Sequence, residues 1–136
     1  MKSNLTPFIK PQEILNEDEI KYLKKKDDLR GISLIIHAWV VIFICVSIYS
    51  LFPNAFTFLL AVILIGGRQL GLAILMHEGA HGLINNKVKS NDFISQWFCA
   101  FPVWLDTFGY RHYHLSHHRH TQKEEDPDIG LSKPFP

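Results

Sequence analysis

Two short stretches of this 136-residue chain are rich in histidine. In "HEGAH", His77 and His81 are four residues apart, and in "HLSHH" the histidines are His114, His117 and His118. Residues three and four apart share one face of a helix, so each stretch can present its imidazoles together. Clustered imidazoles occur in metal sites and in proton relays, and imidazole suits iron, copper, nickel and zinc alike. The two stretches therefore indicate a metal site or a proton relay.

The stretch "HEGAH" also satisfies the H-E-x-x-H pattern of zinc proteases, in which Glu78 would be the general base. The longer metzincin form of that pattern is missing, because Ile84 and Lys87 occupy the positions of its glycine and third histidine. A single zinc ion needs only three or four ligands, which would leave the second stretch without a role. Five imidazoles at ligand spacing, if the two stretches pack side by side, favour two metal ions.

Two long apolar segments predict a pair of transmembrane helices. Residues 32–52, "ISLIIHAWVVIFICVSIYSLF", carry no charge and as a helix span roughly 30 Å, the thickness of a bilayer's hydrocarbon core. After a "PN" turn, residues 55–76 run directly into "HEGAH". Arg68 interrupts this second segment, so either the helix leaves the hydrocarbon near Arg68 or Arg68 faces an internal partner. His37 lies in the first segment, and we expect it to be a packed or interfacial residue rather than a ligand.

Charged residues flank these segments. Residues 1–31 form a polar N-terminal arm, in which "NEDEIKYLKKKDDLR" (16–30) predicts a short surface helix capped by Asn16. The turn at 53–54 has no Lys or Arg, whereas the arm and the region after residue 82 are rich in both. The positive-inside rule therefore places both ends of the hairpin, and every histidine except His37, on the cytoplasmic side. The net charge of +1 gives no general attraction to nucleic acid. Cys45 and Cys99 lie in apolar stretches, and we expect both to be buried and unpaired.

A third apolar segment, "FISQWFCAFPVWL" (93–105), is too short to span a membrane and contains Pro102. It predicts an interfacial or re-entrant helix. Its aromatic side chains recur at helical spacing and either anchor the segment in the membrane interface or form part of the wall of a groove for an acyl chain. These side chains are Phe93, Trp97, Phe101 and Trp104.

Taken in order, "HEGAH" and, some thirty residues later, "YRHYHLSHHRHTQKEEDPD" closely resemble the histidine boxes of the membrane fatty-acid desaturases. The first two boxes of that family read H-x3-H or H-x4-H, and H-x2-HH. The resemblance covers roughly residues 55–136. It implies a non-haem di-iron centre at the cytoplasmic face of the membrane. The metal ligands it implies are His77, His81, His114, His117 and His118.

The resemblance also bears on four residues outside the boxes. We expect His112 and His120 to support the site or to contact solvent rather than to bind metal directly. Asp126 and Asp128 match a "DPD" that often follows the second box in the family. They either orient metal-bound imidazoles through the other ring nitrogen or form an exposed turn around Pro127.

The fold implied is an all-α membrane protein. It consists of the transmembrane hairpin, the short interfacial helix and a cytoplasmic helix that carries the second box, and residues 32–136 form the N-terminal part of a desaturase domain. The activity implied is the introduction of a double bond into a lipid acyl chain, with two iron ions, O2 and two electrons from a ferredoxin-like or cytochrome b5-like donor. Removing hydrogen from an unactivated hydrocarbon chain lies beyond His or Glu acid–base chemistry, which also favours a redox metal.

In the family, a third histidine box and further transmembrane helices follow the second box, whereas this chain stops at "KPFP". We therefore expect an N-terminal portion of a desaturase that is inactive alone and binds metal weakly. Di-iron lipid hydroxylases and carotenoid ketolases share the boxes and are the first alternative. A membrane zinc protease and a histidine-rich metal-handling membrane protein are the more distant ones.

Overall fold

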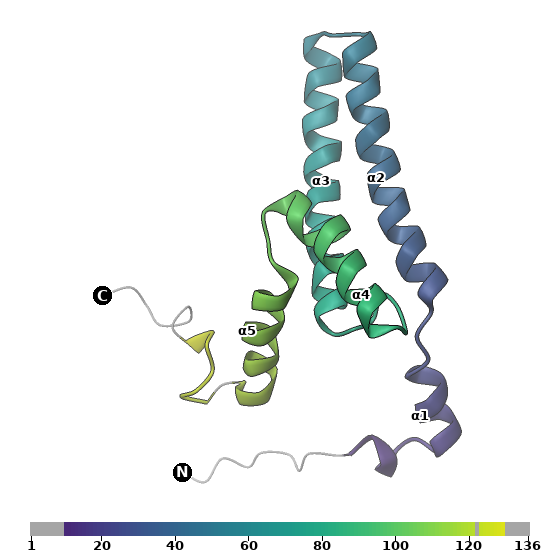
Figure 1. Ribbon diagram of the computed structural model, residues 1–136, viewed down its shortest axis with the longest axis vertical. Coiled ribbons are helices and arrows are strands. Elements are labelled where there is room, and N and C mark those ends of the chain that lie inside the picture. Colours follow the sequence, from purple (N-terminus) through teal and green to yellow (C-terminus); the bar gives the residue numbers. More distant parts are fainter. Residues whose placement is uncertain (1–9, 122, 130–136) are drawn as a thin grey trace.

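Helices form the regular structure of the chain in the computed structural model, which describes residues 10–121 and 123–129 (Figure 1). The described residues include no strand, so the all-α prediction is confirmed. Residues 1–9 of the predicted arm, and residues 122 and 130–136 of the predicted domain, lie outside the described residues. The elements are the 3-10 turn η1 (Pro11–Glu13), α1 (Glu17–Leu23), α2 (Asp28–Leu51), α3 (Ala55–Ala80), α4 (Val88–Ile94), the π-helical turn η2 (Ser95–Ala100), the 3-10 turn η3 (Phe101–Val103) and α5 (Thr107–His120).

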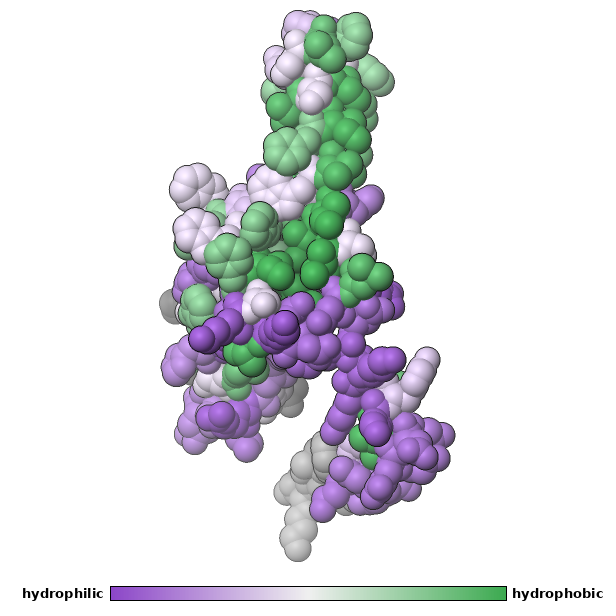
Figure 2. All heavy atoms as spheres, turned by 45° about the vertical axis from the view of Figure 1, so that its right-hand side comes forward, coloured by the Kyte–Doolittle hydropathy of each residue, from purple (hydrophilic) through white to green (hydrophobic). Residues whose placement is uncertain are grey.

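Helices α2 and α3 form the long antiparallel hairpin of Figure 1. Both are long and apolar enough to cross a membrane, and only 17% and 6% of their most apolar windows are buried within the chain. Figure 2 shows the hydrophobic surface that results over the upper part of the hairpin. Helices that are apolar all round and so little covered by their own chain are typical of lipid-facing spans, not of the core of a soluble protein.

Helix α2 begins four residues before the predicted span and ends one residue before its end, and α3 starts as predicted but ends four residues later. Helix α2 begins at Asp28 because the Asp27 side chain accepts a hydrogen bond from the Arg30 amide (3.0 Å) and caps the helix there. Helix α3 begins after Asn54, which forms a reciprocal capping box with Thr57. It continues beyond residue 76 through the whole of "HEGA", so the first histidine stretch is a direct extension of the second span.

Arg68 faces the neighbouring helix of the hairpin. Its Nη1 lies 3.5 Å from Nδ1 of His37 on α2. The sequence left open whether the helix leaves the hydrocarbon near Arg68 or Arg68 faces an internal partner. The structure shows the second arrangement, with His37 as the partner.

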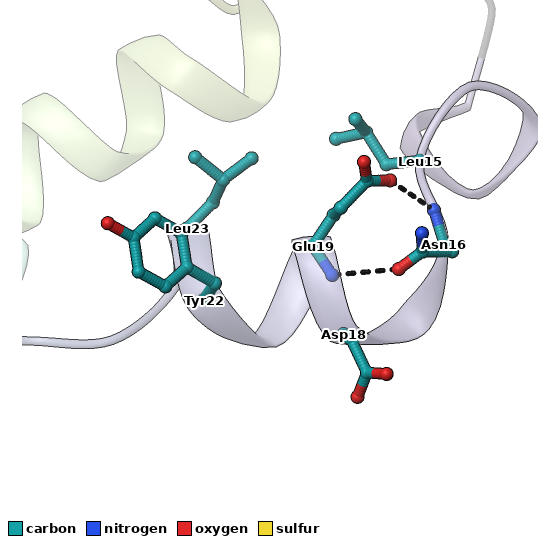
Figure 3. A pocket seen from close by; sticks show the side chains of 6 residues that line it. All are labelled: Leu15, Asn16, Asp18, Glu19, Tyr22 and Leu23. Carbon is teal, nitrogen blue, oxygen red and sulfur yellow. Dashed lines mark hydrogen bonds between the residues drawn. The ribbon is translucent and has the colours of Figure 1, made fainter.

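The predicted surface helix is capped by Asn16, as Figure 3 shows. The Asn16 side chain accepts a hydrogen bond from the Glu19 amide, and the Glu19 carboxylate accepts one from the Asn16 amide, each at 2.9 Å. Helix α1 ends at Leu23, and residues 24–27 separate it from α2. The charged stretch 16–30 therefore forms one short helix and the first residues of the next, rather than a single helix.

One face of the segment α4–η2 packs against the lower part of α3 (Figure 1). The buried residues of the segment are Asn91, Ser95, Gln96, Cys99 and Ala100. Trp39 of α2 fixes it further, since the indole Nε1 donates a 3.0 Å hydrogen bond to the carbonyl of Phe98. The helical segment begins at Val88, five residues before the predicted start.

The aromatic side chains of this segment lie on its opposite, exposed face. The rings of Phe93 and Trp97 are 6.4 Å apart, those of Trp97 and Phe101 are 4.9 Å apart, and Trp104 is almost fully exposed. Trp104 also has a left-handed backbone (φ 61°), where the chain turns from η3 towards α5. One packed face and one aromatic face give the amphipathic character that the sequence predicts for an interfacial segment; the membrane placement stays a prediction.

Candidate metal centre

Four imidazoles converge where the end of α3 meets α5. They belong to His77, His81, His114 and His118, and their ligand nitrogens all lie within 4.8 Å of one another. Nε2 of His114 lies 3.0 Å from Nε2 of His81 and 2.9 Å from Nε2 of His118. We call these residues the four-histidine group. It brings together both stretches of the sequence.

The C-terminal end of α3 is fixed by a glycine cap. Gly82 has a left-handed backbone (φ 72°), its amide donates to the carbonyl of Gly79 (3.0 Å), and the Leu83 amide donates to the carbonyl of Glu78 (2.9 Å). This pair of bonds is a Schellman motif, which ends the helix at a defined residue. His81 is the last residue before that turn. Its imidazole therefore stands on a backbone with little freedom.

Gly79 has a second role at this end of the helix. A Cβ at this position would collide with Oγ of Ser95, so only glycine lets η2 approach α3 this closely. Ser95 is completely buried and exchanges a 3.0 Å hydrogen bond with the Thr107 hydroxyl at the start of α5. The glycine of "HEGAH" thus connects the first histidine stretch to the helix that carries the second.

Helix α5 presents His114 and His118 one turn apart towards α3. Asp106 caps its start by accepting a 2.6 Å hydrogen bond from the Gly109 amide. The ring of Tyr110 stacks on His114, with centroids 5.0 Å apart and planes 13° from parallel, and its hydroxyl lies 3.4 Å from Nδ1 of His114. Sequence analysis did not single out Tyr110; its position one turn before His114 is the signal that could have found it.

Burial and neighbouring imidazoles both disfavour protonation in this group. Burial is the larger cause, and the imidazoles of His77 and His118 add to it, so that the pKa of His81 and that of His114 are lowered from the usual histidine value. Neutral imidazole is the form that binds metal, so these shifts favour metal binding at neutral pH. The Glu78 carboxylate accepts a 3.0 Å hydrogen bond from Nδ1 of His77, which leaves Nε2 of that ring as the nitrogen with a free lone pair.

His117 lies beside this group but has different partners. Its Nδ1 is 2.8 Å from Oδ1 of Asp126 and 3.1 Å from Oδ2 of Asp128, and the Tyr113 hydroxyl donates a hydrogen bond to Asp128. Asp126 is almost fully buried. The hydrogen bond to Asp126 is the main reason that the pKa of His117 is raised. The structure thus brings four of the five predicted ligands together and places His117 with the two carboxylates, a set we call the His117 group.

Among the described residues, His112 and His120 belong neither to the four-histidine group nor to the His117 group. His120 contacts the hydroxyl of Ser116 (3.4 Å), and His112 is exposed on the face of α5 that also bears Arg119. Asp126 contacts an imidazole, that of His117, rather than lying in an exposed turn, so the structure agrees with the first of the two alternatives given for this residue. Arg111 is a further residue that sequence analysis missed, and it bonds to the end of α3.

An apolar groove opens beside the four-histidine group. It has a volume of about 480 Å³ and is lined by Ala73, Ile74, Met76, His77, Glu78, Leu105 and Tyr110. Its apolar lining from α3 continues the surface of the second span up to the first histidine. His77 is thus the member of the four-histidine group that the groove reaches.

The donor set fits a histidine-bound transition metal. Four converging imidazoles suit iron, copper, nickel or zinc. The set fits a zinc protease poorly, because a catalytic zinc keeps one position open for water beside three protein ligands. Glu78, the general base of that alternative, is engaged with the neighbouring His77 ring.

Comparison with known proteins is consistent with this geometry. Residues 53–135 match the model of the family described as fatty acid desaturase. The chain is 30% identical over 107 residues to the dihydrorhizobitoxine desaturase of Bradyrhizobium elkanii, a match that covers 77% of this chain and 30% of that protein. It is 32% identical over 83 residues to the beta-carotene ketolase of Paracoccus sp. (strain PC1), which covers 56% of this chain and 33% of that protein. The chain thus spans about a third of the length of these relatives, and no solved structure matches it significantly.

Proposed function

The chain belongs to the fatty acid desaturase family, and from this premise we propose that it holds histidine-bound iron at the inner edge of a membrane and takes part in oxidising a lipid chain. The reaction we propose is the introduction of a double bond into an acyl chain. The observation that carries the proposal is the junction of the four-histidine group with the apolar groove at the end of a spanning helix.

The chemistry of the proposed reaction explains why a metal is needed. Bound non-haem iron would supply the oxidising power that removes hydrogen from an unactivated hydrocarbon, which side chains alone cannot do. Two hydrogens leave adjacent carbons, each with one electron. O2 accepts these two hydrogens, two electrons from a ferredoxin-like or cytochrome b5-like donor and two protons from solvent, and two water molecules form. In this proposal Ala73, Ile74, Met76 and Leu105 hold the chain and exclude water from it.

The proposal assigns two iron ions to the site. The four-histidine group would hold the first. His117 would contribute to the second through Nε2, because its Nδ1 is engaged by Asp126 and a metal-bound imidazole commonly donates its other N–H to a carboxylate. Glu78 would orient His77 in the same way.

The proposed topology follows from the charges at the two ends of the hairpin. The turn between α2 and α3 has no Lys or Arg, whereas four lysines lie at 21–26 before α2 and further basic residues follow α3. We therefore propose that the N-terminus and both histidine groups are cytoplasmic. There they would meet a soluble electron donor, while the substrate stays in the lipid.

The second candidate reaction is ketone formation or hydroxylation on a lipid such as a carotenoid. It is supported by the similarity to a beta-carotene ketolase, whose identity to this chain is as high as that of the desaturase relative. Both reactions would use the same metal centre and the same kind of groove.

Expression of the complete reading frame in a host, followed by lipid analysis, tests the proposal. We expect new double bonds with the parent and with His112→Gln, and none with His114→Gln, because His114 belongs to the four-histidine group and His112 does not. New ketones or hydroxyl groups instead would favour the second candidate. Unchanged lipids with all three proteins would contradict both.

A further inference from the structure

Arg111 of α5 bonds to the end of α3 and to α4 at the same time. Its Nε donates to the carbonyl of Ala80 (2.9 Å) and its Nη2 to the carbonyl of Gly79 (3.0 Å). Its Nη1 and Nη2 also contact the two carboxylate oxygens of Asp92, at 3.3 and 2.5 Å. A planar guanidinium suits this fork of acceptors, and a lysine ammonium does not.

The carbonyls that Arg111 binds belong to the last turn of α3, directly before His81. The last four carbonyls of a helix have no partner within the helix and carry its negative dipole end, so a cation is favourable there. The Gly79 carbonyl also accepts a 2.9 Å hydrogen bond from Nδ2 of Asn91, which is buried. Arg111 and Asn91 thus hold the backbone of "HEGAH" from two sides.

Asp92 braces the guanidinium from α4. Both side chains are only about a fifth to a quarter exposed. The hydrogen bond from Arg111 is the main reason that the pKa of Asp92 is lowered, so the carboxylate stays charged at a lower pH than an ordinary aspartate. Through Asn91 and Asp92, α4 fixes both the end of α3 and the arginine that binds it.

Arg111 shares a helix stripe with two metal-site histidines. Arg111, His114 and His118 stand at i, i+3 and i+7 of α5, which is one face of a helix. The hydrogen bonds of Arg111 to Gly79 and Ala80 therefore fix how α5 is rotated about its axis, and how far it is shifted along that axis, relative to His81. The ring nitrogens of His81, His114 and His118 meet at 2.9–3.0 Å, one turn further along the same stripe.

We propose that Arg111, braced by Asp92, is a positioning residue that sets the geometry of the four-histidine group by clamping α5 to the C-terminal end of α3. The inference deepens the proposed function, since it concerns the same metal centre. It does not depend on which lipid is oxidised or on which product forms.

The test is a Co(II) titration of the detergent-solubilised chain, read from the ligand-field spectrum, for the parent and three variants. Arg111→Gln removes the fork, Arg111→Lys keeps only the charge, and Arg119→Gln is the matched control, since Arg119 is an exposed arginine of the same helix. We expect Arg111→Gln to lose at least about tenfold in Co(II) affinity and to change the spectrum, the size seen for residues that orient metal ligands. Arg111→Lys should fall between Arg111→Gln and the parent, and Arg119→Gln should match the parent.

Helical content from circular dichroism separates positioning from folding. If Arg111→Gln unfolds, the folded Arg111→Lys variant tests the proposal instead. An unaltered Co(II) spectrum in Arg111→Lys would then overturn it. Equally tight binding of Co(II) by Arg111→Gln and Arg119→Gln would overturn it as well.

A distance measurement on the metal-free chain keeps this inference separable from the proposed function. Spin labels at Leu70→Cys on α3 and Leu115→Cys on α5 report the relation of the two helices; both positions are exposed, whereas Cys45 and Cys99 are buried and burial raises the pKa of Cys99 to about 12. We expect Arg111→Gln to broaden the distance distribution and Arg119→Gln to leave it unchanged. If the parent bound no Co(II), the proposed metal centre would be contradicted. An unbroadened distance distribution in Arg111→Gln would contradict the proposed positioning role of Arg111.

Discussion

The two histidine groups share helix α5, which carries His114 and His118 of the first group and His117 of the second, and they differ in what surrounds the imidazoles. In the four-histidine group the rings face one another, and burial and mutual repulsion lower the pKa of His81 and of His114. In the His117 group a buried carboxylate faces the ring and raises the pKa of His117. One turn of helix therefore separates imidazoles that favour the neutral form from one that favours the charged form.

Under the proposed function, this difference assigns two roles to the imidazoles. Rings that converge through Nε2 provide a ready donor set for one ion. A ring held through Nδ1 by Asp126 is oriented by the protein and has its second nitrogen left for a further ligand or ion. The predictions below separate these roles, from the largest expected effect to the smallest.

Removing His114 should have the largest effect, because its Nε2 contacts both His81 and His118. We expect His114→Ala to lower the affinity for the first equivalent of Co(II) by more than about 100-fold, beyond the range typical of residues that only orient ligands. Isothermal titration of the solubilised chain measures it. His117→Ala is the comparison and should leave the first equivalent bound; equal losses in both variants would remove the distinction between the two groups.

Replacing Asp126 should affect only the second equivalent of metal. Without its carboxylate, Asp126→Asn leaves His117 less fixed and less basic, so we expect a loss of about 10- to 100-fold in affinity for the second Co(II) and no change for the first. The same titration reads both steps. A weakened first step would show that the His117 group supports the four-histidine group rather than a separate position.

Gly79→Ala should destabilise the packing of η2 against the end of α3, beside the four-histidine group. The new methyl would collide with Ser95, and overpacking of this kind destabilises by about 1–3 kcal/mol. Gly66→Ala is the matched control, since a Cβ there meets nothing within 4 Å. We expect thermal unfolding in detergent at a lower temperature for Gly79→Ala only. Equal melting temperatures for the two variants would contradict the close approach of η2 to α3.

The pH dependence of stability gives the smallest effect. In the metal-free chain, His117 has a raised pKa, so its pairing with Asp126 stabilises the fold below the unfolded histidine value of about 6.5 and is lost as the pH rises through the raised value. The stability deficit of Asp126→Asn should therefore be largest below about pH 6.5 and shrink at higher pH. Melting curves across the pH range measure it, and a deficit that grew with pH would have the wrong sign.

Much of the fold was predictable because charge and caps mark its boundaries. The charge-free run 32–52 and the "PN" turn located both spans to within four residues, and Asn16 was recognised as a cap from its position before three acidic residues. Helical spacing placed the aromatic side chains of the third apolar segment on one face, and the structure shows that this face is exposed. The sequence did not locate the start of the segment at Val88. Its first turn exposes Val88 and Lys89 and buries the polar Asn91, the reverse of the pattern expected for an amphipathic helix.

The sequence predicted that the two histidine stretches meet, but not how their side chains are grouped. Spacing placed His114, His117 and His118 on one face. In the structure His114 and His118 join the histidines of α3, whereas His117 contacts Asp126, nine residues further along the chain. Arg111 escaped notice because its partners on α3 are backbone carbonyls, which leave no side-chain pattern to read.

Iron K-edge X-ray absorption on the chain loaded with one equivalent of Fe(II) addresses the central claim most directly, because multiple scattering counts the imidazoles bound to the ion. Our account predicts four imidazoles, from the ends of α3 and α5. A single imidazole with carboxylate oxygens would place the ion in the His117 group and contradict it.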